Sequence, residues 1–131
     1  MNEELSFRLT LRLFKGEKAF GPGIAELMRN IERFGSLQKA AESMDMAYSK
    51  AWKMVRETER LLGFPLTNRV IGGENGGGSN LTPEGRLFLE RYEAFAEDVK
   101  KKTEESFRKH FSDDFFTELD KVKAKGAKEV H

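Results

Sequence analysis

Cysteine is absent from the 131 residues, and histidine occurs only as His110 and His131. Without cysteine the chain has neither disulfides nor thiolate metal sites, and two histidines so far apart do not form a metal site. The apolar runs fall far short of the about 20 residues that a membrane span needs. The N-terminus lacks the basic start and apolar stretch of a signal peptide. We therefore expect a cytoplasmic protein with no cofactor, no metal and no membrane partner.

Catalytic signatures are also missing. The sequence contains no Gly-x-Ser-x-Gly and no histidine beside a serine. The acidic pairs Glu104-Glu105 and Asp113-Asp114 are typical of solvated helix ends rather than of acid/base catalysis. Residues 72–80 hold five of the twelve glycines, but Gly-Lys-Ser/Thr of a nucleotide-binding loop is absent. We do not expect an enzyme.

A strong net charge is lacking as well, because 23 basic residues face 22 acidic ones. The charges are nevertheless unevenly placed. Residues 33–56 hold five basic and two acidic side chains, whereas residues 83–120 hold seven basic and eleven acidic ones. This distribution indicates a basic face and a more acidic helix, although ordinary solvated surfaces give the same pattern.

Hydrophobic periodicity predicts mostly helices. Alternation over residues 5–14 indicates a half-buried strand, and spacing of three and four indicates a helix from Ile24 to Phe34. Further helices are expected over residues 36–44, with Ser36 as N-cap, and 47–62, with Trp52 partly inward and Gly63 as C-cap. Short strands at 66–71 and near Leu81 flank the glycine-rich loop. A long helix from Pro83 to about 107 and a frayed, lysine-rich tail complete the chain.

Residues 36–62 are two helices joined by a short turn, which is the helix-turn-helix arrangement. The small pair Ala40-Ala41 lets the helices cross closely. The second helix presents side chains that donate hydrogen bonds to base edges or phosphates: Tyr48, Ser49, Lys50, Lys53 and Arg56. A purely structural helical hairpin with a solvated face is the alternative.

The two strands and the loop after this motif predict a wing. Backbone amides of Gly76, Gly77 and Gly78 and the side chains of Arg69, Asn75 and Asn80 could reach phosphates. A plain surface loop is the alternative. In the long helix, one face carries Phe88, Tyr92, Phe95 and Val99. We expect this face to form a symmetric dimer, which doubles the base contacts of a single winged helix.

Four motifs together resemble one family. They are Gly35-Ser-Leu-x-x-Ala-Ala, Tyr48-Ser-Lys-Ala-Trp, Gly72-Gly-x-x-Gly-Gly-Gly and Leu81-Thr-Pro-x-Gly. In this order they resemble the N-terminal DNA-binding domain of the molybdate-responsive ModE regulators, and more distantly that of LysR-type regulators. The resemblance implies a dimer that binds palindromic DNA. Its first strand, here with Leu9 and Leu11, and its long last helix would form the dimer.

The same resemblance implies roles for individual residues. Helix 47–62 would enter the major groove, and Ser36, Gln38 and Lys39 would contact DNA from the preceding helix. Two positions depart from the family pattern. Ala47 stands where a serine N-cap is usual, and Asp45 replaces the turn glycine. Full-length ModE regulators also carry C-terminal oxyanion-binding domains, and these 131 residues match only the DNA-binding part.

The predicted fold class is mainly α with a small β hairpin, a winged helix-turn-helix with a long C-terminal dimerisation helix. We expect a DNA-binding and dimerisation domain over residues 1–110, and a short helical segment with a lysine-rich tail over 111–131. The predicted function is homodimeric regulation of transcription on double-stranded DNA, linked to molybdate or anion metabolism, with a separate sensor protein as a further partner. A protein-interaction module of the same fold and, more distantly, an anion carrier or enzyme remain alternatives.

Overall fold

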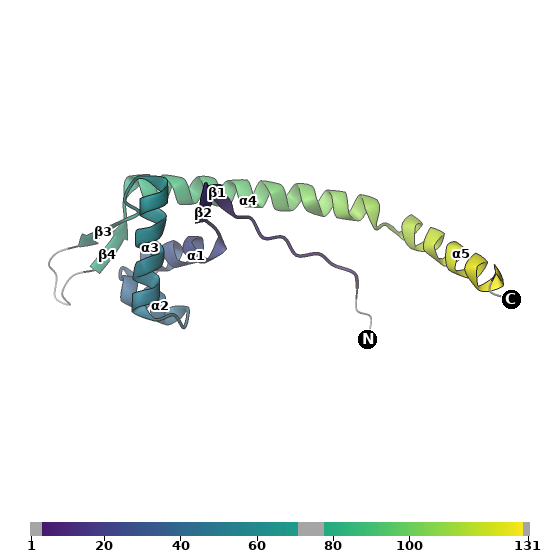
Figure 1. Ribbon diagram of the computed structural model, residues 1–131, viewed down its shortest axis with the longest axis horizontal. Helices are drawn as coiled ribbons and strands as arrows, with labels where there is room; N and C mark the ends of the chain where they lie inside the picture. The colour runs from purple at the N-terminus through teal and green to yellow at the C-terminus, as the bar shows by residue number, and fades with distance from the viewer. Residues whose placement is uncertain (1–3, 71–77, 130–131) are drawn as a thin grey trace. The chain divides into compact units, whose positions relative to one another are not determined.

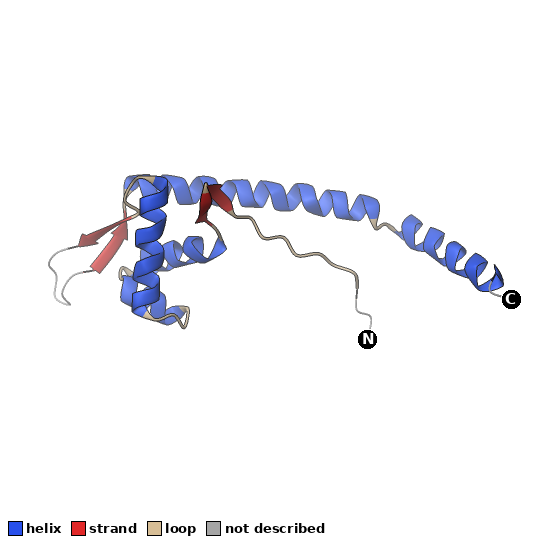
Figure 2. Ribbon diagram, in the orientation of Figure 1, coloured by secondary structure: helices blue, strands red, loops and turns tan. Residues whose placement is uncertain are grey.

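The computed structural model describes residues 4–70 and 78–129. Helices dominate, and two small antiparallel hairpins accompany them (Figures 1 and 2). The helices are α1 (Pro22–Phe34), α2 (Leu37–Ser43), α3 (Tyr48–Leu62), α4 (Pro83–His110) and α5 (Asp113–Glu129). The strands are β1 (Leu13–Lys15), β2 (Glu17–Phe20), β3 (Thr67–Val70) and β4 (Gly78–Leu81). The predicted mainly α fold with a wing hairpin is confirmed.

The first hairpin differs from the prediction. Strand β1 covers only three residues and pairs with β2, a strand that the sequence pattern does not predict. Residues 4–12 lie outside any strand, and Leu5 and Leu9 are 55% and 47% exposed, so the expected half-buried strand over 5–14 is wrong. An alternating apolar pattern forms a strand only where a partner strand supplies hydrogen bonds. Strand β2 is short and pairs only with residues 13–15.

Contacts between residues divide the chain into two units. The first unit contains residues 10–95, and the second contains residues 1–9 and 96–131. In the first unit, α1 contributes Leu27, Met28 and Ile31, all fully buried, and ends at Gly35 in the left-handed conformation. Ile24 and Ala25 of α1 also belong to the core. The other core residues come from β2, α2, α3, β4, α4 and the segment before β3: Phe20, Ala40, Ala41, Ala51, Val55, Leu66, Leu81, Leu89 and Tyr92.

The second unit is held by aromatic contacts. The Phe7 ring lies 5.1 Å from that of Phe107, and Phe111 lies 5.4 Å from Phe107 and 5.3 Å from Phe115, measured between ring centroids. Helix α5 extends through the lysine-rich segment to Glu129. The frayed tail that the sequence predicts is therefore wrong for the lysine-rich residues up to Glu129, which continue the helical segment expected after residue 110. Within the described ranges, no helix has both the length and the apolar character of a membrane span.

Candidate nucleic-acid interface

Helices α2 and α3 form a helix-turn-helix. The Ser36 hydroxyl accepts a hydrogen bond from the Lys39 amide at 3.2 Å, so it is the predicted N-cap of α2. Ala40 and Ala41 are buried where α2 packs on the core, and small side chains there let helices approach closely. Asp45 adopts a φ of 52° in the turn. This left-handed conformation normally favours glycine, and Asp tolerates it better than most residues.

Helix α3 buries one face and exposes the other. Ala51, Val55 and Thr58 point into the core. The five predicted DNA-contacting residues of this helix are all exposed: Tyr48, Ser49, Lys50, Lys53 and Arg56. The structure therefore leaves this side of α3 accessible to a duplex.

Two neighbours restrain Arg56. Its guanidinium lies 5.3 Å from the Trp52 ring centroid and pairs with the Glu59 carboxylate at 3.1 Å. Glu59 also accepts the Leu66 amide hydrogen bond at 2.7 Å, which fixes the start of the wing to α3. Trp52 is 45% exposed, so it is partly covered, in line with the expectation that it points partly inward. Its i, i+4 spacing from Arg56 was the signal for this stacked pair.

The wing base is joined to the start of α2. The Ser79 amide donates to the Gly35 carbonyl at 2.9 Å, one residue before the Ser36 cap. Any side chain at Gly78 would collide with that same carbonyl oxygen, so Gly78 is a packing residue of strand β4 rather than part of a loop. The anchor places the wing base next to α2, whose first turn carries exposed Gln38 and Lys39.

The remaining wing predictions fall in two groups. Arg69 and Asn80 are exposed on the paired strands, where Arg69 lies opposite Ser79 and Asn80 opposite Asn68. Asn75, Gly76 and Gly77 lie outside the described residues.

The expected dimer face of α4 divides between core and surface. Phe20 lies 4.8 Å from Phe88 and 4.9 Å from Tyr92, between ring centroids. The Tyr92 hydroxyl donates to the Leu11 carbonyl at 2.8 Å. We therefore withdraw Phe88 and Tyr92 from the dimer face, because they pack within their own chain.

Three other residues of the expected dimer face are accessible. Leu9 and Phe95 are exposed and Val99 is half-buried. Leu11 is half-buried and packs against the core. Only Leu9, Phe95 and Val99 thus remain candidates for contact with a second copy.

Comparison with known proteins agrees with this geometry. The family model described as "Bacterial regulatory helix-turn-helix protein, lysR family" matches residues 25–86. Among solved structures, the BenM DNA-binding domain in complex with benA site 1 DNA aligns with a TM-score of 0.52 at 20% identity, covering 69% of this chain and 96% of that one. VV2_1132, a LysR family transcriptional regulator, aligns with the same TM-score and identity over 70% of this chain and 30% of its own.

Several curated relatives carry the name ModE. The molybdenum transport protein ModE of Azotobacter vinelandii is 40% identical over 68 residues, which is 52% of this chain and 25% of that protein. The DNA-binding transcriptional dual regulator ModE of Escherichia coli strain K12 is 32% identical over 90 residues, which is 68% of this chain and 34% of that protein. The chain thus spans only a quarter to a third of these relatives. Residues 25–86 thus match the lysR family of bacterial regulatory helix-turn-helix proteins, and the chain is similar in sequence to ModE regulators.

Proposed function

We propose that this protein is a transcriptional regulator that reads double-stranded DNA with α3. The observation that carries the proposal is the exposed face of α3, which presents Ser49, Lys50 and Lys53. The opposite face of this helix is buried in the core. A rigid helix with free donors on its outer face is the element that enters the major groove in helix-turn-helix proteins. Ser36, Gln38, Lys39, Arg69 and Asn80 would hold flanking phosphates.

A homodimer on a palindromic operator is part of the proposal. Exposed Leu9 and Phe95 and half-buried Val99 are the side chains that a second copy would cover. Two copies would place two α3 helices on half-sites about one helical turn apart. The names of the relatives, which mention molybdenum, favour genes of molybdate or anion metabolism as the targets. A separate protein would act as the sensor. Such a regulator acts in the cytoplasm, and its activity requires no catalysis.

Substitution of two lysines tests the role of α3. Lys50→Ala and Lys53→Ala should each weaken duplex binding, measured by fluorescence anisotropy at several salt concentrations. If the lysine contacts a base, the binding free energy should fall by about 1–3 kcal/mol. If it contacts a phosphate, the slope of log K against log salt should become shallower by about one. Neither lysine packs in the core, so the unfolding free energy should stay unchanged.

Lys102→Ala is the matched control, because Lys102 pairs with Asp98 on α4 and belongs to no predicted contact. It should bind DNA like the wild type. Unchanged affinity of both α3 variants would refute the assignment of α3. If the wild type bound no duplex at all, the fold would serve a protein partner instead, as its near-neutral charge allows.

A further inference from the structure

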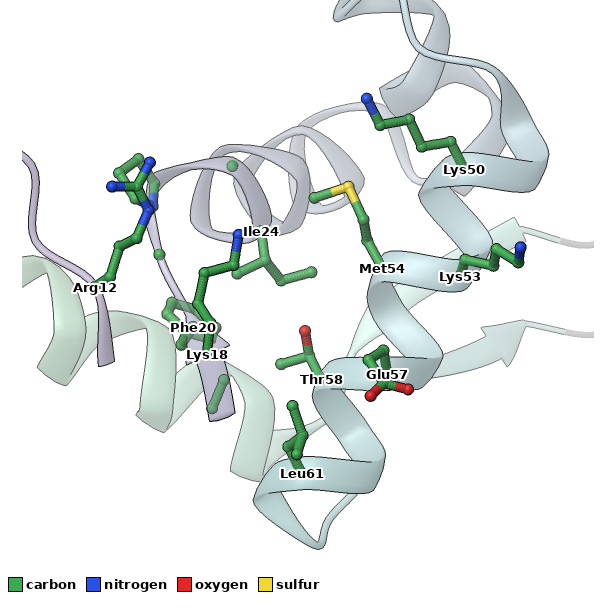
Figure 3. Close-up of a pocket in the computed structure, with 14 residues that line it drawn as sticks. Arg12, Lys18, Phe20, Ile24, Lys50, Lys53, Met54, Glu57, Thr58 and Leu61 are labelled. Carbon is green, nitrogen blue, oxygen red and sulfur yellow. The ribbon is translucent and has the colours of Figure 1, made fainter. Parts of the chain in front are cut away.

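A pocket of about 490 Å³ opens beside α3, at the junction of β2 and α1. One wall is the flank of α3 from Lys50 to Leu61, and the other is formed by residues 18–24 with Arg12 (Figure 3). In the view of Figure 1, the β1–β2 hairpin lies on one side of α3 and the β3–β4 hairpin on the other. The pocket is thus on the side of α3 away from the wing.

Positive charge gathers around this pocket. Arg12, Lys18, Lys50 and Lys53 line it, and all four are exposed. Among the residues that the structure describes, no carboxylate forms an ion pair with any of them. Figure 3 shows the Lys53 ammonium turned outward, away from the other three.

The one acidic side chain of the lining is already engaged. Glu57 pairs with Arg60, and this contact lowers the pKa of the Glu57 carboxyl group. Because Arg60 neutralises Glu57, the lining of the pocket keeps an excess of positive charge, which favours an anionic ligand.

The backbone favours the same ligand. Gly21 is the N-cap of α1 and provides no side-chain hydrogen bond, and the first turn of α1 carries no acidic residue. Residues 21–24 line the pocket, and Pro22 has no N–H group. The amides of Gly23 and Ile24, which have no helical carbonyl to bind, therefore add to the positive charge of the lining.

The floor of the pocket is apolar. Phe20 and Ile24 are buried beneath it, and Met54 and Leu61 are half-buried at its wall. A ligand that fits both parts has an anionic group next to a less polar body. The sugar–phosphate backbone of DNA has this character, with each phosphate flanked by a deoxyribose.

We propose that this pocket binds a backbone phosphate of the duplex and its adjoining deoxyribose, with Arg12 and Lys18 as DNA-contacting residues. The inference rests on the proposed function and adds to it. Arg12 and Lys18 precede the segment 25–86 that matches the lysR family, so they extend the interface beyond that domain. The duplex is then held from both sides of α3, by the wing and by the β1–β2 hairpin.

The double variant Arg12→Gln/Lys18→Gln tests this pocket. Because counterion release scales with the number of neutralised phosphates, the slope of log K against log salt should become shallower by about 0.9 for each phosphate that is no longer neutralised. The binding loss should be equal on a selected operator and on an unrelated duplex, since a phosphate contact carries no sequence information. Circular dichroism should show an unchanged fold, because both side chains are exposed.

Two controls define the result. Lys15→Gln removes an exposed charge from the same hairpin outside the pocket and should leave the slope unchanged. Lys18→Arg keeps the charge and should retain the wild-type slope. An unchanged slope in the double variant, with the wild type still binding DNA, would overturn the inference while leaving the proposed function intact.

An experiment with inorganic phosphate distinguishes a free anion from a DNA phosphate as the ligand of this pocket. At constant ionic strength, it should raise the melting temperature of the wild type no more than that of the double variant. A phosphate-dependent rise that is absent in the double variant, together with an unchanged DNA salt slope, would make the pocket a small-anion site and refute the DNA assignment. Absence of duplex binding by the wild type would instead refute the proposed function.

Discussion

At Gly85, the absence of a side chain lets two segments of the chain touch. The Thr82 hydroxyl accepts the Gly85 amide hydrogen bond at 2.9 Å and donates to the Pro65 carbonyl at 2.6 Å. A Cβ atom at Gly85 would lie 2.5 Å from the Leu66 carbonyl oxygen. The Thr-Pro-x-Gly motif is thus the joint that fixes the start of α4 to the end of α3 and the wing.

Gly85→Ala should therefore lower the free energy of unfolding by about 1–3 kcal/mol, the usual cost of forcing an extra methyl group into a packed site. Urea titration followed by circular dichroism measures it. Gly126→Ala is the matched control, because Gly126 lies within α5 with open space around it. There alanine should be neutral or stabilising by up to about 1 kcal/mol. Equal stability of the two variants would contradict the tight contact at Gly85.

Residue-level predictions succeeded where the signal is local. Ser36 as N-cap, Gly63 as C-cap and Asp45 in the turn depend on neighbours within a few positions, and all are confirmed. The close contacts of Gly78 and Gly85 join residues far apart in the sequence. No spacing rule reveals such contacts, so the sequence pattern alone predicts Gly78 in the loop.

At the scale of elements, α3 begins without a side-chain cap. Ala47 is its N-cap residue, with φ −62° and ψ 140°, and makes no side-chain hydrogen bond. These dihedral angles suit a capping serine, whose hydroxyl would accept the Lys50 amide at the third helical position. The helix that we assign to the major groove thus forgoes a stabilising contact at its DNA-facing end.

Ala47→Ser should raise the free energy of unfolding by about 1 kcal/mol. Thermal or urea denaturation of the two proteins at the same concentration checks this. Ala47→Val places a larger side chain there without a hydrogen-bond acceptor, and it should give no gain. A serine variant no more stable than the valine variant would show that the first turn of α3 needs no cap.

Element predictions failed where neighbours decide the outcome. Alternation over residues 5–14 resembled a strand, but a strand exists only where β2 pairs with it. The charged sequence of β2 gave no apolar signal of its own. Conversely, the lysine-rich end was expected to be frayed, yet α5 continues through it. Near the start of this helix, Phe115 packs edge-to-face on Phe111, and Asp113 and Asp114 lie in the first turn.

At the scale of the whole molecule, net charge hides the features that indicate DNA binding. The chain carries a net charge of only +1. Arg12, Lys18, Lys50 and Lys53 nevertheless lie around one pocket beside α3, and no ion pair among the described residues involves them. The asymmetry between 33–56 and 83–120 is visible in the sequence. The roles of Arg12 and Lys18 are not, because only the folded β1–β2 hairpin brings them to α3.

Selection of binding sites from random duplex DNA at about 0.15 M salt, followed by salt titration of the best site, tests the central claim most directly. We predict a palindromic consensus with two half-sites about one helical turn apart, and binding that weakens steeply as salt rises. A consensus with a single half-site would contradict the dimer. Failure to enrich any sequence, with weak binding to every duplex, would contradict DNA reading by α3.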